Sequence, residues 1–298
     1  MKNDEIICVG EILWDSLPAG LFLGGAPFNV AHDLHRLGNN VRIISRVGRD
    51  SLGEEILRRV AGEGMSTDLI QVDDKLPTGF VEVVMDKKGD PSYRIREPVA
   101  WDSIESGEEL LQTARGAHML VFGTLACRNK TSRETIYNLA EAASLRVLDV
   151  NLRPGANSKE IVEDLLNAAD IVKVNSLELD TLRKWFGLPV NERDAAGELA
   201  EKFSCKIVCV SHGADGGSMW NEGRWVNHPG FSVDVQNSVG AGDAFLAGLL
   251  TSFIRGKSDD EMIETANLLG AYVVTQAGAT PEFDLNDLDA IRSNVSGR

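Results

Sequence analysis

Short apolar, β-branched runs alternate with amphipathic segments along most of the chain, and this alternation restricts the folds open to it. The strand-like runs are residues 6–9, 41–45, 118–122, 146–150, 171–174 and 206–210. The first helical segment is expected over 27–37, with Gly38 as its left-handed end. Ser or Thr followed three residues later by Glu predicts capped helix starts at Ser51, Thr131 and Ser258. Strand, helix and strand repeated in this way predict an α/β fold, with a mostly parallel sheet covered by helices on both faces.

Two segments break this alternation. Residues 79–85 and 92–96 are strand-like runs around the sequence KKGD at 87–90, a pattern typical of a hairpin. Residues 13–23 form a second, irregular excursion. We expect about 13–23 and 78–101 to form a small β lid on a single α/β domain that spans residues 1–298, although a surface hairpin without a role fits the pattern equally well.

The charge balance excludes some classes of partner. The chain has 30 Lys and Arg against 45 Asp and Glu, a formal charge of −15. Nucleic acids and anionic membranes are bound by clustered basic residues, so neither is expected as a partner. The sequence contains no run of about 18 apolar residues, so no membrane span is expected. The expected partners are therefore small molecules.

The cysteines and the N-terminal residues favour a reducing compartment. The four cysteines are Cys8, Cys127, Cys205 and Cys209, and the first eleven residues show no secretory signal pattern. Cys205 and Cys209 lie in a strand-like run with no second ligand pair nearby, which disfavours a zinc site. We expect reduced, buried thiols in a cytoplasmic protein.

The most informative run is NSVGAGDAF, from Asn237 to Phe245, between a strand-like run at 231–235 and a helical pattern at 244–254. Gly240 and Gly242 let main-chain N–H groups crowd together at a helix N-terminus, which favours an anion such as phosphate. Asp243 follows in the first turn, where a carboxylate can take a proton from an attacking hydroxyl. Taken alone, the pattern also fits a helix-start Asp that complements the helix dipole.

Two widespread nucleotide-binding motifs are missing from the sequence. The Walker A pattern occurs nowhere in the chain, and a dinucleotide fingerprint would need a glycine at the position of Phe245. The first strand-like run also continues into residues 10–14 without a glycine cluster. A nicotinamide-dependent oxidoreductase is therefore disfavoured.

A second polar group of residues lies near the N-terminus. The sequences EILWD at 11–15 and GGAPFN at 24–29 place carboxylates, two glycines and the amide of Asn29 close together. Carboxylates and amides can each pair with neighbouring sugar hydroxyls, so the pattern suits a polyol substrate. A tight turn at Gly24 before an ordinary helix start would also account for it.

Together, GGAPFNVA at 24–31 and VGAGDAF at 239–245 resemble the two signatures of the ribokinase-like, or PfkB-type, carbohydrate kinases. Further landmarks in family order lie at 149–154, 175–178, 211–216, 266–267 and 278–281, so the resemblance covers nearly the whole chain. It implies a ribokinase-like three-layer α/β fold with a small β lid. The implied activity is that of an ATP-dependent sugar kinase, which transfers the γ-phosphoryl group to a sugar hydroxyl.

Within this family, three segments look most like bacterial fructokinases. They are GEILWD at 10–15, GGAP at 24–27 and YRIREPVAWD at 93–102. Ribokinases and phosphofructokinases usually carry a lysine after the paired glycines, where this chain has Ala26. Fructose is therefore the first expected substrate.

Other functions remain open at this point. A 2-keto-3-deoxygluconate kinase is the nearest alternative, because Arg94, Arg96 and Arg153 could hold a carboxylate. Ribose and nucleoside kinases share the fold. A non-catalytic sugar-binding regulator is the alternative of another class, but the retained Asp243 and glycines disfavour it.

The resemblance also implies roles for single residues. Asp243 would activate the sugar hydroxyl as the catalytic base, while the main-chain N–H groups of Gly240, Ala241 and Gly242 would stabilise charge on the transferred phosphoryl group. The sugar would be contacted by Asp15, Gly24, Gly25, Asn29, Arg94 and Arg153. ATP would be contacted by Asn175, Ser211, Gly213, Gly216, Gly240, Gly242 and Asn267. Mg²⁺ would be held, mainly through water, by Asn175 and Glu178.

Two further expectations come from the family. Many members bind K⁺ with the help of an Asp in an Asp-Thr pair, where this chain has Asn237-Ser238; Asn lacks the charge, so any monovalent cation site near Asn237 should be weak and K⁺ dependence weak or absent. Lids of this family exclude water and tend to pair between subunits. A homodimer through the lid would follow, although the sequence pattern does not establish one.

Overall fold

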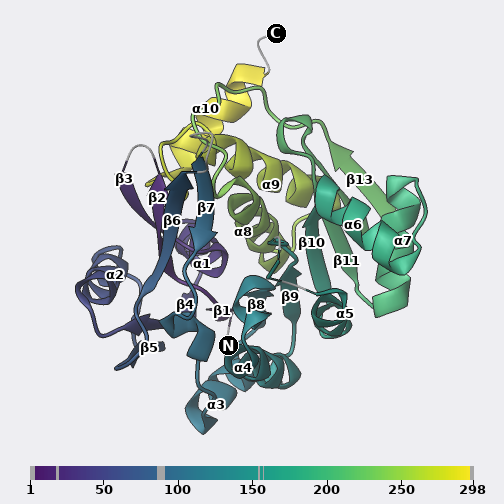
Figure 1. Cartoon of the computed structure of the whole chain (residues 1–298). Coiled ribbons are helices and arrows are strands. Elements are labelled where there is room, and N and C mark those ends of the chain that lie inside the picture. The colour runs from purple at the N-terminus through teal and green to yellow at the C-terminus, as the bar shows by residue number, and fades with distance from the viewer. Residues whose placement is uncertain (1–3, 18–19, 86–90, 154, 157, 296–298) are drawn as a thin grey trace.

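The computed structural model describes residues 4–17, 20–85, 91–153, 155–156 and 158–295 (Figure 1). Its main sheet consists of β1 (Ile6–Val9), β4 (Val41–Gly48), β5 (Ile70–Asp73), β8 (Met119–Gly123), β9 (Arg146–Asp149), β10 (Ile171–Asn175), β11 (Ile207–Ser211), β12 (Gly217–Asn221) and β13 (Arg224–His228). The strand order is β13-β12-β11-β10-β9-β8-β1-β4-β5. The pairs from β5 to β11 are parallel, and β12 and β13 add an antiparallel edge. The predicted mostly parallel sheet is thus confirmed.

Helices cover both faces of this sheet, as the alternating sequence predicts. One face is covered by α1 (Ala26–Arg36), α2 (Ser51–Gly62), α8 (Ala241–Ile254), α9 (Asp259–Val273) and α10 (Leu285–Val295), and the other by α3 (Glu108–Gly116), α4 (Lys130–Ala142), α5 (Lys159–Asn167), α6 (Ser176–Phe186) and α7 (Glu192–Phe203). Strand β1 shows why: Ile6 and Cys8 enter the first core, while Ile7 and Val9 enter the second. Side chains alternate across a strand, so a strand that is apolar throughout needs cover on both sides. Short 3₁₀ helices lie at η1 (Ala100–Ser103), η2 (Leu125–Arg128) and η3 (Gly213–Asp215).

A separate small sheet contains β2 (Leu13–Leu17), β3 (Gly20–Gly24), β6 (Gly79–Met85) and β7 (Pro91–Ile95), in the order β3-β2-β6-β7. Figure 1 shows these strands in purple and blue, away from the strands at the β13 edge. The predicted pairing of β6 with β7 is confirmed, while the turn predicted at 87–90 lies outside the described residues. Strands β2 and β3, within the segment 13–23, belong to one small sheet with β6 and β7, as predicted; they are more regular than expected, because β2 pairs with β3 on one side and with β6 on the other.

Two of the three predicted helix caps are displaced by one or two residues. Asp50 caps α2 by accepting from the N–H of Gly53, and Asn129 caps α4 by accepting from the N–H of Thr131. In each case a good capping side chain lies one or two positions before the predicted one, so Ser51 and Thr131 fall inside the helix. Ser258 does cap α9 in a capping box, as expected.

The position of β1 marks where a ligand site should form. It lies between β4 and β8, so the chain leaves the sheet centre in opposite directions from this strand. In open α/β sheets, a crevice forms at the carboxyl ends of the strands at such a switch point. Gly10 and Glu11 follow β1 at this place.

Within the described ranges, no helix combines the length and the apolar character that crossing a bilayer requires. All four cysteines are buried and free.

Candidate active site

Helix α8 begins at a glycine that a larger residue could not replace without strain. Gly240, its N-cap, has a φ of +84°, and a Cβ added there would lie 2.7 Å from the Cα of Ala279. Gly240 has no side chain to cap the helix, so no capping side chain covers the first N–H groups of α8, of which that of Ala241 donates to the carbonyl of Ser238 at 3.4 Å. These groups and the helix dipole favour an anion at this position.

Asn29 on α1 and Asp243 on α8 are joined by a hydrogen bond. Nδ2 of Asn29 donates to Oδ2 of Asp243 at 2.7 Å, across 214 positions of sequence. Both side chains are buried, 3% and 7% exposed. Within the described chain, Oδ1 of Asn29 has no hydrogen-bond partner. A buried acceptor of this kind is available to a donor on a ligand.

Asp15 on β2 lies beside this pair. A Cβ added to Gly24 would collide with Oδ2 of Asp15 and would lie 3.8 Å from Oδ1 of Asn29. Glycine therefore leaves the space in which the two side chains approach each other. Asp15, Asn29 and Asp243 are called the polar cluster below.

The environment of Asp243 suits a general base. Burial, followed by the charge of Asp149, raises the pKa of Asp243 to about 7. Lys173, the hydrogen bond from Asn29 and the charge of Arg153 act in the opposite direction. A carboxyl group with a pKa near 7 can both hold and release a proton at neutral pH.

Arg153 is exposed but faces three carboxyl groups at this site. Burial raises the pKa of Asp15 to about 6, and Arg153 opposes that shift. Burial likewise raises the pKa of Glu11 to about 7, again against the charge of Arg153. The arginine therefore stabilises the ionised forms of Asp15, Glu11 and Asp243.

Lys173 is absent from the residues predicted above, yet it lies at the start of α8. Its Nζ is 3.0 Å from Oδ1 of Asp149, and both side chains are about 5% exposed or less. A Cβ added to Gly242 would lie 2.8 Å from Nζ of Lys173. Burial disfavours the ammonium, but Asp149, Glu178 and Asp243 outweigh it and raise the pKa of Lys173. A lysine inside an apolar strand was the available signal, because buried lysines are nearly always paired.

Asn175 and Glu178 form the capping box of α6. Oδ1 of Asn175 accepts from the N–H of Glu178 at 2.9 Å, and Oε2 of Glu178 accepts from the N–H of Asn175 at 2.8 Å. Oε1 of Glu178 accepts from the N–H of Leu152 at 2.9 Å. Burial and then the charge of Asp149 raise the pKa of Glu178. Both oxygens of Glu178 thus have main-chain donors, which fits contact with a metal through water better than direct coordination.

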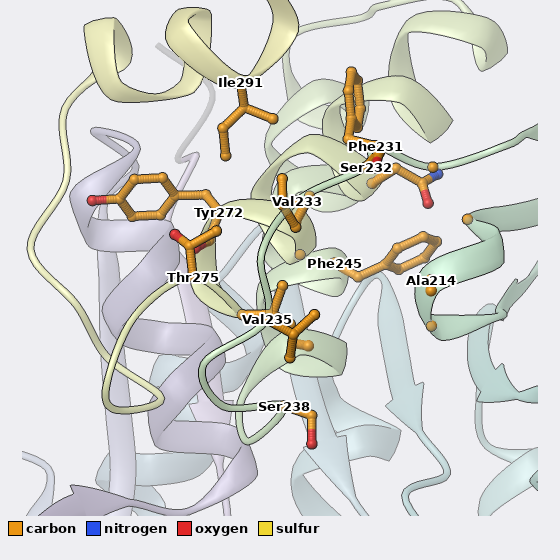
Figure 2. A pocket seen from close by; sticks show the side chains of 18 of the residues that line it. Ala214, Phe231, Ser232, Val233, Val235, Ser238, Phe245, Tyr272, Thr275 and Ile291 are labelled. Atoms are coloured by element: carbon orange, nitrogen blue, oxygen red, sulfur yellow. The ribbon is translucent and has the colours of Figure 1, made fainter. Parts of the chain in front are cut away.

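A cavity of about 1410 Å³ lies beside the start of α8. Its lining includes six residues predicted to contact ATP or the phosphoryl group: Ser211, Gly213, Gly216, Ala241, Gly242 and Asn267. Figure 2 shows apolar side chains around it, among them Phe231, Val233 and Phe245. Apolar walls with main-chain polar groups at one end are typical of nucleotide-sized ligand sites.

The segment 231–235 forms one wall of this cavity, and the prediction of a strand there is wrong. All five of its residues line the cavity, and no regular strand is assigned to them. The chain that follows is bonded to the end of α9, where the N–H of Gln236 donates to the carbonyl of Val274 at 2.8 Å. The apolar pattern therefore reflects packing around the cavity, without a partner strand.

Arg94 belongs to the small sheet. It is exposed on β7, and in the part of the chain that the structure describes no hydrogen bond or ion pair joins it to Asp15, Asn29 or Asp243. The contact predicted between Arg94 and a sugar therefore stays a prediction.

Asn237 closes a turn ahead of α8. Its Oδ1 accepts from the N–H of Val239 at 3.0 Å, and its Nδ2 donates to the carbonyl of Ala277 at 3.1 Å. The side-chain oxygen is thus already engaged. Among the described residues, no group of three His, Cys, Asp or Glu side chains could hold a metal ion.

The small sheet contacts the loop that packs behind α8. A Cβ added to Gly278 would lie 2.8 Å from the ring of Phe22 on β3. The next residue, Ala279, is the one that packs against Gly240. Phe22, residues 278–279 and Gly240 therefore form a continuous line of contacts.

Comparison with known proteins identifies the family. Residues 19–284 match the pfkB family carbohydrate kinases. The chain belongs to this family. It is 30% identical to the fructokinase of Escherichia coli over 294 residues, which cover 92% of this chain and 94% of that protein. It is 28% identical to the aminoimidazole riboside kinase of Salmonella typhimurium over 275 residues, 89% of this chain and 85% of that protein.

A solved structure of fructokinase with bound ATP from Xylella fastidiosa has the same fold, with a TM-score of 0.83, 24% identity and coverage of 99% of this chain and 100% of that chain. As a pfkB family carbohydrate kinase, the chain is an ATP-dependent sugar kinase. Asp243 of its polar cluster and Ala241 and Gly242 of its cavity lining lie together in the first turn of α8.

Proposed function

We propose that this kinase is a fructokinase, which transfers the γ-phosphoryl group of ATP to a hydroxyl of fructose. The observation that carries the proposal is the hydrogen bond from Asn29 to Asp243. It joins the segment that resembles a sugar-binding signature to the helix start that resembles a phosphate-binding one. The similarity to the E. coli fructokinase supports the choice of sugar.

In this proposal, the sugar lies against the polar cluster. Asp15 and the free Oδ1 of Asn29 accept hydrogen bonds from sugar hydroxyls. Oδ2 of Asp243 is held by Asn29, so the carboxylate has a fixed orientation when it takes the proton of the attacking hydroxyl. Gly24 and Gly25, whose missing side chains leave room for Asp15 and for the carbonyl oxygen of Glu11, would contact the sugar through their backbone.

Charge on the transferred phosphoryl group is stabilised mainly by groups that are already in place. The main-chain N–H groups of residues 240–242 belong to the start of α8, and Nζ of Lys173 lies beside Gly242. Phosphoryl transfer depends mostly on such positioning and electrostatic stabilisation. Mg²⁺, held through water by Glu178 and Asn175, would neutralise further phosphate charge when bound.

ATP would occupy the cavity, with its base towards Asn267 and its phosphates towards Gly242. Both residues line the cavity, as do Ser211, Gly213 and Gly216. The small sheet, about residues 13–23 and 78–101, would act as the lid that keeps water from the sugar site. In this proposal, two such sheets pair in a homodimer, and the enzyme works in the cytoplasm.

A substrate with a carboxylate is less well supported. Arg153 already faces Glu11, Asp15 and Asp243, and Arg96 is paired with Glu82 at 2.7 Å. A 2-keto-3-deoxygluconate kinase would need Arg153, Arg96 or Arg94 for the carboxylate of its substrate, and the first two already face acidic side chains. A neutral ketose needs none.

The proposal is tested by ADP release in a coupled assay with fructose, ribose, 2-keto-3-deoxygluconate, aminoimidazole riboside and adenosine. We expect the highest kcat/KM for fructose. A higher value for a riboside or for the keto acid would replace fructose with that substrate. ADP release with none of them, in protein shown to bind ATP, would favour a non-catalytic sugar-binding protein.

A further inference from the structure

Glu11 is a buried carboxylate at the centre of the molecule. It follows β1 at the switch point of the main sheet and is 2% exposed. Its Oε2 has no hydrogen-bond partner among the described residues. A buried carboxyl oxygen without a hydrogen-bond partner lowers the stability of the fold, so its presence here points to a functional role.

The carboxylate contacts the start of α1. Hydrogen bonding from the main-chain N–H of Glu11 itself and from that of Ala26, the first residue of this helix, opposes the effect of burial and lowers the pKa of Glu11. The N-cap of α1 is Gly25, which has no side chain, and the first turn carries no acidic residue. In its ionised form, Glu11 therefore supplies from outside the helix the negative charge that a helix N-terminus favours.

The backbone of Glu11 is equally close to this helix. A Cβ added to Gly25 would collide with the carbonyl oxygen of Glu11. The carbonyl of Gly25 in turn accepts from the N–H of Asn29 at 2.8 Å. Glu11, the Gly25 turn and Asn29 thus form one connected unit, which ends at Asp243 through the side chain of Asn29.

Charged and titratable groups face Glu11 from three directions. Arg153 attracts its negative charge, Asp243 on α8 repels it, and Cys127 in η2 is a further neighbour. Asp243 is itself faced by Asp149 and Lys173 from β9 and β10. Loss of the charge on Glu11 would therefore ease the ionisation of Asp243.

We propose that Glu11 is a positioning residue of the phosphoryl transfer, whose carboxylate fixes the start of α1 and, through Asn29, the orientation of Asp243. This inference rests on the proposed role of Asp243 as the base. A purely structural carboxyl group would stabilise the fold without any effect on the ionisation of that base.

The variants Glu11→Gln and Glu11→Ala separate these two roles. Gln keeps an oxygen that can accept from Ala26 but removes the charge. The acid limb of the pH profile, which is the fall of kcat/KM for the sugar at low pH, should therefore shift to lower pH by at least about half a unit. Ala also removes the hydrogen bond, so kcat should fall at least about tenfold while KM for ATP changes less than about twofold.

Asp33→Asn is the matched control. Asp33 lies on the same helix, is 0% exposed and also has an oxygen without a partner among the described residues, Oδ2. Burial alone raises the pKa of Asp33. This variant should leave the acid limb unchanged. Circular dichroism and thermal unfolding of each variant show whether it is folded.

Wild-type pH profiles in Glu11→Gln would overturn the inference, even if Glu11→Ala failed to fold. The proposed function is tested separately by Asp243→Ala. If that variant is inactive while Glu11→Gln behaves as the wild type, only the role of Glu11 is wrong. If Asp243→Ala keeps full turnover, the proposed base is wrong and the role of Glu11 fails with it.

Discussion

Nδ2 of Asn29 donates to Oδ2 of Asp243, and this bond connects helices that lie at opposite ends of the sequence. Asn29 belongs to the first turns of α1, and Asp243 to the first turn of α8. Both helices cover the same face of the main sheet and begin near the switch point. In the proposed mechanism, the sugar side and the phosphate side of the site meet at this one hydrogen bond.

Asp243→Ala should lower kcat at least about a hundredfold, because removal of a general base commonly costs a factor of about 10²–10⁴. Affinities for sugar and ATP, measured by calorimetry, should be largely retained. Asp260→Ala is the control, since Asp260 lies in the first turn of α9 and is 69% exposed. Near-normal turnover of purified Asp243→Ala would remove this residue from its role.

The pH dependence should reflect the raised pKa of Asp243. Burial raises that pKa to about 7, and only the ionised carboxylate can take a proton. The value of kcat/KM for the sugar should therefore fall as the pH decreases through about 7, and level off above it. An activity that stays constant down to pH 5 would contradict this assignment.

Lys173→Met should be both less stable and less active. It leaves Asp149 buried without its cation, which commonly costs about 3–5 kcal/mol. The double variant Lys173→Met, Asp149→Leu removes both charges and should recover much of the stability in urea unfolding. If the ammonium serves phosphoryl transfer, kcat of the double variant stays low. Recovered kcat would show that the pair is only structural.

Gly240→Ala should abolish most of the activity. Gly240 has a φ of +84°, and the added Cβ would lie 2.7 Å from Ala279. Gly256→Ala provides the comparison, because Gly256 has a φ of +64° but no atom near an added Cβ. Both variants carry backbone strain, and only Gly240→Ala has the collision. Equal activities in the two variants would exclude a special role for this close approach.

Exchange of Na⁺ for K⁺ should change the rate little. Asn237 lacks the charge of an Asp, and its side-chain oxygen already accepts from the N–H of Val239. The measurement compares kcat at equal ionic strength in the two salts. A strong increase in K⁺ would mean that main-chain carbonyls suffice for the cation.

Local patterns predicted six of the nine described strands of the main sheet but missed β5, β12 and β13, and long-range contacts were out of their reach. Residues 6–9 read as a strand because all four are apolar, and the structure has β1 there. Residues 231–235 have a similar pattern but pack around the cavity, a difference that depends on whether a neighbouring strand is present. Apolar residues alone do not distinguish the two situations.

The candidate site shows the same limit. The glycines and Asp243 form a compact sequence motif, whereas Lys173 acquires its meaning only from Asp149, 24 positions away. Similarly, Ser51 looked like a helix cap until the preceding Asp50 proved to accept from Gly53. Pairings of this kind depend on three-dimensional proximity and on competition between neighbouring side chains.

The contacts from Phe22 through residues 278–279 to Gly240 connect the small sheet with the start of α8, so binding at one should affect binding at the other. A displacement of the small sheet would loosen the packing behind the start of α8. Sugar and nucleotide should consequently bind with positive cooperativity, and an enzyme that lacks its sugar should hydrolyse ATP only slowly.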